Sequence, residues 1–183
     1  MTAEPNVESA SADIQASAVN TIVLGFAADP ITRWVWPDSS EYLRIMPQFV
    51  KAFGGRAFEH GTAYITEGTR AAALWLPPGV EPDEEAMGEV VAQALRPEIA
   101  DDMQFMFKGM AEHHPHEPHW YLPLIAADPN WIGQGLGTLL MKHAATWRAS
   151  APISKARIRA IFPFMNATAS ESSVRYSTVL HRR

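Results

Sequence analysis

Three glycines stand within five positions of the chain, at Gly133, Gly135 and Gly137. An apolar run, residues 119–127, precedes them, and a run of helical character follows at 135–149. A strand, a glycine-rich turn and a helix start can bind an anion, because the first N–H groups of a helix lack partners and lie at its positive end. Glycine leaves those groups open to a phosphate. The candidate donors are Gly133, Gln134, Gly135, Leu136, Gly137 and Thr138.

Two other glycine loops do not match this stretch. The P-loop of nucleotide hydrolases requires Lys-Ser/Thr after its last glycine, whereas Gly137 is followed directly by Thr138. The dinucleotide fingerprint is spaced G-x-G-x-x-G and follows a first strand, whereas this loop is spaced Gly-x-Gly-x-Gly and comes late in the chain. On the loop alone, a tight turn without a ligand remains the alternative.

The surroundings of the loop resemble the acetyl-CoA-binding motif of the Gcn5-related N-acetyltransferase (GNAT) family. That motif is an apolar strand, an Asp/Ser-Pro turn and Gln/Arg-x-x-Gly-x-Gly/Ala at the start of a helix. Pro129, Gly135, Gly137 and Leu140 match it. Ile132 stands where the family usually has Gln or Arg, a side chain that reaches toward the pyrophosphate. The resemblance therefore implies weaker coenzyme binding, carried by backbone donors.

Three further segments resemble the puromycin N-acetyltransferase-like branch of that family: "GFAADPITRWVWPD", "TRAAALWLPPG" and "EPHWYLPLIAADP". The likeness covers about residues 12–147. It implies that acetyl-CoA, as co-substrate, lies between two splayed parallel strands and bonds to strand backbone like an added strand. Ile125, Ala126 and Ala127 would supply those bonds. Pro123 predicts a break in regular pairing, since proline is confined to sheet edges and bulges.

The pattern of elements predicts an α/β (α+β) fold, the GNAT fold, with a mixed central sheet flanked by helices. Residues 1–149 form the acetyltransferase domain, and 150–183 a divergent tail of disordered or irregular structure. The expected elements are an edge strand around 6–9, helices at 12–26 and 39–54 with Ser39 or Ser40 as cap, strands within 56–79 with turns at Gly61 and Gly68, helices at 82–95 and 97–114, a strand at 119–127 and a helix at 135–149.

The tail lacks the end of the family pattern, which is a strand, a helix with Asn near its start and Tyr near its end, then "HGF" and a closing strand. Only 157–164 could form a short strand. With permitted synonymous codons, residues 154–170 can be read one frame over as "ESTNPRNIPFYERHGF". We therefore hypothesise a shifted reading frame that begins near 148–153, the alternative being a genuinely divergent C-terminus. The strand at 119–127 would then present an unpaired edge and half the cleft would be absent.

The resemblance implies acetyl transfer from acetyl-CoA to the amine of a small molecule, by direct attack in a ternary complex and impaired by the altered tail. A coenzyme-binding but catalytically inactive protein is the alternative. A base or water chain must take the amine proton, and Glu117 and Tyr121 lie near the expected place. Trp34 and Trp36 could wall the acceptor pocket for a flat amine.

Composition restricts the partners. The chain has 183 residues, 47% of them hydrophobic, and no cysteine, which fits one cytoplasmic domain without disulfides or thiolate metal sites. Residues 148–183 hold seven basic residues and one acidic residue, which leaves 8 basic and 19 acidic residues before them. An acidic body is a poor nucleic-acid binder. We expect no nucleic-acid or membrane partner, and a monomer or homodimer.

Four histidines fall within seven residues, at His113, His114, His116 and His119. Histidine is a common metal ligand. The intervening prolines and the position at a helix end leave no pair at i, i+4 on a regular helix face. We therefore expect a solvated loop here and no metal site.

Overall fold

A computed structural model describes residues 6–149 and 158–159 of the chain. These residues contain a five-stranded sheet whose strand order follows the sequence. The first four strands are antiparallel neighbours, and the last pairs parallel to the fourth. The strands are β1 (Val7–Ser9), β2 (Ala63–Thr66), β3 (Ala71–Leu76), β4 (Trp120–Ala127) and β5 (Ile158–Arg159).

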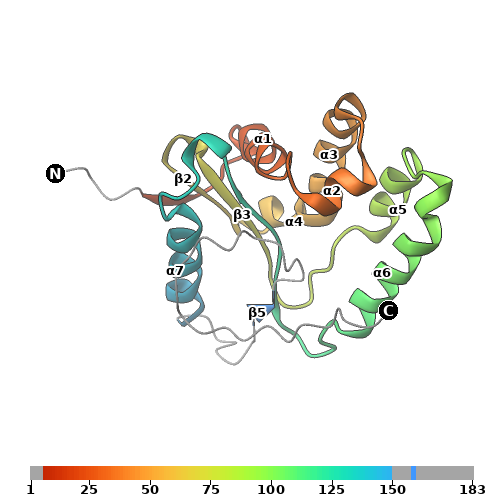
Figure 1. The fold of residues 1–183 in the computed structure, drawn as a ribbon. Coiled ribbons are helices and arrows are strands. Elements are labelled where there is room, and N and C mark those ends of the chain that lie inside the picture. Colours follow the sequence, from red (N-terminus) through yellow and green to blue (C-terminus); the bar gives the residue numbers. More distant parts are fainter. Residues whose placement is uncertain (1–5, 150–157, 160–183) are drawn as a thin grey trace.

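Helices cover both faces of this sheet (Figure 1). The helices α1 and α3 pack on one face, where both contact β3 and β4, and α7 packs on the other face across β1 to β4. The α-helices are α1 (Gln15–Gly25), α2 (Pro30–Val35), α3 (Ser39–Gly54), α4 (Arg56–Glu59), α5 (Glu84–Ala92), α6 (Ala100–Glu112) and α7 (Leu136–Ala149). Three short 3-10 turns are η1 (Glu67–Thr69), η2 (Pro97–Ile99) and η3 (Pro129–Trp131).

The sheet separates two hydrophobic cores. Leu74 and Leu124 belong to the larger core beneath α1 and α3, whereas Trp75 belongs to the smaller core beneath α7. At Gly25, helix α1 lies directly on β4, because a Cβ added there would stand 2.6 Å from the Cβ of Ala126. Burial on both faces explains why β3 and β4 read as continuous apolar runs rather than alternating ones.

Strand β4 contains a bulge at the proline that the sequence singles out. Leu74 pairs with Leu124, but Leu76 pairs with Tyr121, so β4 contains one residue more than β3 between these pairs. Pro123 lies within that interval, which confirms the predicted break in pairing. The extra residue changes the side-chain alternation, and Tyr121 and Leu124 therefore face the same core.

Several predicted boundaries need correction. Residues 56–59 form helix α4 rather than a strand. The cap of α3 is Asp38, not Ser39 or Ser40, and its carboxylate accepts the Glu41 N–H at 2.9 Å. Aspartate is as good an N-cap as serine, and it directly precedes the helical run.

The turns at Gly61 and Gly68 are confirmed, since both glycines have left-handed backbones with φ of 65° and 67°. The predicted edge strand around 6–9 is present as β1, which pairs with β2. The remaining predicted elements occur with shifts of a few residues at their ends. Sequence periodicity therefore placed most elements correctly.

The free edge of β4 is shorter than expected. Trp120 and Tyr121 pair in parallel with Ile158 and Arg159, so the expectation of an unpaired edge is wrong at these two positions. Beyond Tyr121, no described strand pairs with that edge of β4. The other expectations for the tail, at 150–157 and 160–183, lie outside the described residues.

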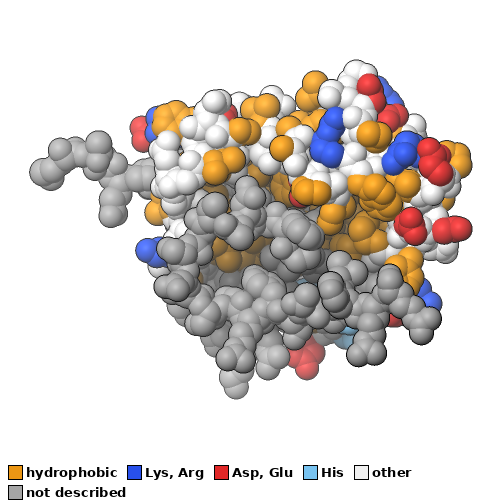
Figure 2. Space-filling model, viewed as in Figure 1, with side chains coloured by type: hydrophobic (Ala, Val, Ile, Leu, Met, Phe, Trp, Pro, Cys, Tyr) orange, Lys and Arg blue, Asp and Glu red, His pale blue; other side chains and the backbone are white. Residues whose placement is uncertain are grey.

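Hydrophobic side chains gather over α5 and α6 on the face shown in Figure 2. Met106 and Phe107 of α6 pack partly against the larger core, while Phe105 is 80% exposed. Within residues 6–149 and 158–159, none of the helices has the combination of length and apolar character that a membrane span requires.

Candidate functional site

The turn between β4 and α7 is fixed before its glycines begin. The Asp128 carboxylate accepts the Asn130 N–H at 2.8 Å, and the Asp128 carbonyl accepts the Trp131 N–H at 2.8 Å. The Asp128 N–H donates to the Arg70 carbonyl at 2.8 Å. The Arg70 guanidinium lies 3.9 Å from the centre of the Trp131 ring, a cation–π contact. These bonds attach η3 to the start of β3.

The structure explains the presence of glycine differently at the three positions. Gly133 and Gly135 have left-handed backbones, with φ of 82° and 77°, which any side chain would strain. Gly137 lies in the first turn of α7 and has no such requirement. A Cβ at any of the three would meet no atom within 4 Å. Packing therefore does not explain Gly137, and open space borders the helix start.

The predicted main-chain donors come together at this helix start. The first helical bond of α7 that involves the loop is donated by Leu139 to the Gly135 carbonyl, at 2.9 Å. Among the described residues, no acceptor pairs with the main-chain N–H groups of 133–138. Leu136 and Leu140 anchor the helix in the smaller core. The arrangement is a rigid turn with unpaired donors at a helix N-terminus, which suits a phosphate.

Three residues of β4 are predicted to bond the coenzyme through their main-chain groups, and two of them direct these groups to the free edge of the strand. In antiparallel pairing, consecutive residues point their N–H and C=O groups alternately to either side. Because Asp128 bonds to Arg70 of the β3 side, the main-chain groups of Ala126 also face β3. Those of Ile125 and Ala127 face the opposite edge. A ligand lying along β4 would therefore find bonding groups at Ile125 and Ala127, not at Ala126.

Ile132 does not cover the donors by packing into the turn. Its side chain is 51% exposed, and its backbone is extended, with φ of −60° and ψ of 145°. The donors following it at Gly133 and Gly135 belong to exposed residues. The departure from the family pattern at Ile132 removes a polar side chain while leaving the backbone donors accessible.

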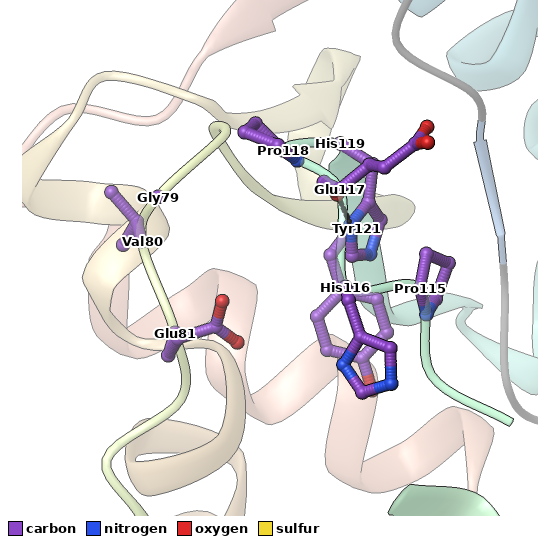
Figure 3. A pocket seen from close by; sticks show the side chains of 9 residues that line it. All are labelled: Gly79, Val80, Glu81, Pro115, His116, Glu117, Pro118, His119 and Tyr121. Carbon is purple, nitrogen blue, oxygen red and sulfur yellow. Dashed lines mark hydrogen bonds between the residues drawn. The ribbon is translucent and has the colours of Figure 1, made fainter. Parts of the chain in front are cut away.

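A hollow lies at the other end of β4, away from the glycine turn. It has a volume of about 120 Å³ and lies between the β3–α5 connection and the loop before β4 (Figure 3). Its walls combine carboxylates, imidazoles, prolines and one phenol. The lining residues are Gly79, Val80, Glu81, Pro115, His116, Glu117, Pro118, His119 and Tyr121.

Tyr121 belongs to this hollow but cannot serve as its base. Its side chain is buried, and burial raises the pKa of the Tyr121 phenol far above its ordinary value, with a smaller contribution from the Glu81 charge. The phenol stays protonated at neutral pH and can donate a hydrogen bond but not take a proton.

Glu117 lies at the rim of the hollow. Its side chain is exposed, and in Figure 3 the carboxylate points away from Tyr121. Its main-chain carbonyl accepts a hydrogen bond from Nδ1 of His119 at 2.9 Å. The carboxylate that faces Tyr121 is that of Glu81 (Figure 3), which sequence reasoning missed. No sequence signal links Glu81 to a loop more than thirty residues away.

The predicted acceptor tryptophans do not line the hollow. Trp36 is 3% exposed and packs edge-on against Phe49, with ring centres 5.7 Å apart. Phe49 contacts Phe53 at 5.4 Å, and Phe53 contacts Tyr121 at 6.0 Å. Two phenylalanine rings therefore lie between Trp36 and Tyr121 in this series of aromatic contacts.

Trp34 is 38% exposed, and its carbonyl accepts a bond from Arg96 Nη2 at 2.6 Å. It does not line the hollow next to Tyr121. The histidine-rich loop contributes His116 and His119 to the walls. Across the described part of the chain, no three His, Asp or Glu side chains are placed to hold a metal ion.

Comparison with known proteins agrees with this geometry. The sequence model of the acetyltransferase (GNAT) family matches residues 31–158, which include β4, the glycine turn and the whole of α7. The chain belongs to this family of acetyltransferases. The mixed sheet flanked by helices, predicted from the sequence, is confirmed.

Two of the solved structures that resemble the chain are acetyltransferases. One is the histone acetyltransferase HPA2 and related acetyltransferase from Corynebacterium glutamicum ATCC 13032, with a TM-score of 0.52 and 22% identity over 79% of this chain and 71% of that one. This likeness shows the fold. The other is an acetyltransferase with a TM-score of 0.41 and 18% identity, covering 79% of this chain and 75% of that one.

Proposed function

We propose that the protein transfers an acetyl group from acetyl-CoA to the amine of a small molecule, as a member of the puromycin N-acetyltransferase-like branch. One observation carries the proposal: the free edge of β4 leads directly into a turn whose main-chain N–H groups are unpaired among the described residues. A coenzyme with a pyrophosphate and an amide-containing arm needs both features in series.

The residues present fit acetyl-CoA. The N–H groups of 133–138 would hold the pyrophosphate, and the missing side chain at Gly137 leaves room for it. The outward main-chain groups of Ile125 and Ala127 would bond the pantetheine amides. The coenzyme supplies an acetyl group activated as a thioester. The chain's part is to fix that group along β4, which turns an encounter in solution into a positioned reaction.

The acceptor would enter from the opposite end of the same strand. Tyr121 lies four residues before Ile125, about 13 Å away at roughly 3.3 Å per residue. The hollow at Tyr121 is therefore separated from the pyrophosphate turn by the length of β4. Amine attack needs a proton acceptor near the amine, and the imidazoles and carboxylates of this hollow provide candidates.

The altered C-terminus bears on how active the chain is. We propose that the tail arises from a shifted reading frame and that it impairs turnover. Sequencing the gene and its transcript tests this: one insertion or deletion near codons 148–153 should restore a strand, a helix ending in Tyr and "HGF". If no single-base change restores that pattern, the tail is a divergent end of the protein.

We also propose a cytoplasmic monomer or homodimer without a nucleic-acid or membrane partner. The acidic composition supports the absence of a nucleic-acid partner.

Release of coenzyme A tests the activity. The full chain is mixed with acetyl-CoA and a panel of primary amines, and thiol release and acetylated product are both measured. Product formation supports the transferase. Calorimetric binding of acetyl-CoA without product on any amine supports the coenzyme-binding, inactive alternative. If the chain neither binds acetyl-CoA nor releases coenzyme A, both the transferase and the inactive, coenzyme-binding alternative are rejected.

A further inference from the structure

One imidazole nitrogen in the hollow lacks an explanation. His119 is 9% exposed, and its Nδ1 lies 2.9 Å from the Glu117 carbonyl. A carbonyl only accepts hydrogen bonds, so Nδ1 carries the proton of the neutral ring. Nε2 then holds a bare lone pair. Among the described residues this atom is buried and has no partner, a rare condition for a polar atom in a native fold.

The neighbours of His119 keep this site low in charge. The His114 ring packs at 62° to it, with centres 4.8 Å apart, and the Nε2 of His114 is also buried without a described partner. Burial lowers the pKa of His114, the charges of His119 and His116 lower it further, and only Glu81 opposes them. Burial therefore favours the neutral form of the His114 ring. The titratable groups around His119 are His114 after α6, Glu81 before α5, His116 and Glu117 in its own loop, and Tyr121 in β4.

The hollow is small and suits a small chemical head. Its volume is about 120 Å³. Pro115, Pro118 and Val80 make parts of its wall apolar. Glu81 carries the negative charge that faces Tyr121 across it (Figure 3). A cationic head on a narrow, unbranched stem suits this combination of small size, apolar walls and one facing carboxylate.

We propose that this hollow binds the head of an unbranched primary amine as its ammonium ion, between Glu81 and the Nε2 lone pair of His119, and that His119 takes the ammonium proton. The inference rests on the proposed acetyl transfer for its catalytic part and names the acceptor class. It differs from the flat amine expected between Trp34 and Trp36, because neither tryptophan lines this hollow.

The proposed step balances as follows. Nε2 of His119 takes one proton from the R–NH₃⁺ head, which leaves R–NH₂ with a free electron pair. That pair forms the C–N bond to the thioester carbon while the C–S bond breaks. The second nitrogen proton ends on the departing sulfur, and His119 returns its proton to solvent. The products are the amide, coenzyme A thiol and one proton.

Amine binding is tested without acetyl-CoA. The full chain is titrated with n-hexylamine, and the histidine ring nitrogens are followed by NMR; tert-butylamine serves as a branched control. We expect the Nε2 signal of His119 to shift with n-hexylamine and not with tert-butylamine. Glu81→Gln should weaken hexylamine binding about tenfold. The matched control His60→Asn, at an exposed histidine after α4, should leave it unchanged.

Catalysis is tested with His119→Asn. Asparagine can keep a donor to the Glu117 carbonyl while it removes the Nε2 lone pair, so a thermal melt near that of the wild type will show that the fold is kept. We expect kcat with n-hexylamine to fall about a hundredfold and the acidic limb of the pH–rate profile to change, with KM for acetyl-CoA unchanged. Glu81→Gln should raise KM for the amine more than it lowers kcat.

The two arms separate the two proposals. Ring shifts without any coenzyme release would reject acetyl transfer and keep the amine pocket. Coenzyme release without ring shifts, equal shifts with tert-butylamine, or an unchanged pH profile in His119→Asn would overturn the inference. Release that is lost equally in His60→Asn would also contradict it.

Discussion

The ring of His114 stands at 90° to the ring of Tyr121, with their centres 5.0 Å apart. His114 follows helix α6, and Tyr121 lies in β4 next to the bulge at Pro123. Phe53 of α3 packs edge-on against Tyr121 as well, at 6.0 Å. Edge-to-face contacts of this kind fix ring orientation. The strand whose free edge we propose for the coenzyme therefore also positions a phenol in the wall of the hollow next to Tyr121.

Replacing Gly137 should separate stability from coenzyme binding. A Cβ there meets no atom within 4 Å, and φ is not left-handed, so Gly137→Ala should stabilise the free protein by up to about 1 kcal/mol. The same methyl group enters the space proposed for the pyrophosphate. We expect acetyl-CoA affinity to fall at least about tenfold, which is about 1.4 kcal/mol.

Gly88→Ala is the matched control for this change. Gly88 lies in α5, is exposed, and offers equally open space. It should show a similar gain in stability with acetyl-CoA affinity unchanged, as measured by urea unfolding and calorimetry. Equal affinity in Gly137→Ala and the wild type would show that no ligand approaches this helix start.

The glycine loop shows what could be predicted from the sequence. Spacing alone placed the donors at 133–138, because a strand, a turn and a helix start are local features with strong signals. Pro123 likewise predicted the irregularity in β4 from one residue. The assignment of Ala126 as a coenzyme contact was not resolvable, since the direction of its main-chain groups depends on pairing with β3.

The hollow next to Tyr121 shows what could not be predicted. Glu81 and His119 come together only because the β3–α5 connection and the loop before β4 lie side by side. No local pattern encodes that contact. The burial of Trp36 against Phe49 is likewise a tertiary contact that sequence spacing does not reveal.

Gly25→Ala should destabilise the fold. The added Cβ would stand 2.6 Å from the Ala126 Cβ and 2.9 Å from the Ala127 carbonyl oxygen, so α1 must move off β4. Overpacking of this kind costs about 1–3 kcal/mol. Urea unfolding compares this variant with Gly88→Ala. A wild-type midpoint in Gly25→Ala would mean that α1 does not lie against β4 as described.

Alkaline pH should weaken the fold through buried tyrosines. The Tyr42 hydroxyl donates to the Val23 carbonyl at 2.5 Å, and burial raises the pKa of Tyr42, as it does that of Tyr121, above the ordinary 10.0. Folding therefore favours the protonated phenols. Their contribution is complete below pH 10 and is lost as pH rises through the folded pKa.

Tyr42→Phe tests this linkage. At neutral pH it should cost about 1 kcal/mol for the lost hydrogen bond. Above pH 10 its stability should fall less steeply than that of the wild type, as measured by urea unfolding at a series of pH values. Parallel curves for the two proteins over that range would rule out Tyr42 as a source of the pH dependence.

Acid should weaken the start of α3. The Ser40 hydroxyl and the Glu41 N–H both donate to the Asp38 carboxylate and hold its pKa below the ordinary 3.8. The stabilising contribution is therefore present above pH 3.8 and is lost as pH falls through the folded pKa. Asp38→Ala should lower the midpoint of thermal unfolding at neutral pH by a few degrees, and this difference should shrink in acid. A difference that stays constant into acid would contradict the role of the charged carboxylate.

We propose that the unpaired main-chain N–H groups between Gly133 and Thr138 bind the pyrophosphate of the coenzyme. Amide NMR of the full chain during a titration with coenzyme A measures this residue by residue. We expect the largest N–H shifts at 133–138, with smaller ones at Ile125 and Ala127. Saturation with coenzyme A that leaves the 133–138 amides unmoved would contradict it.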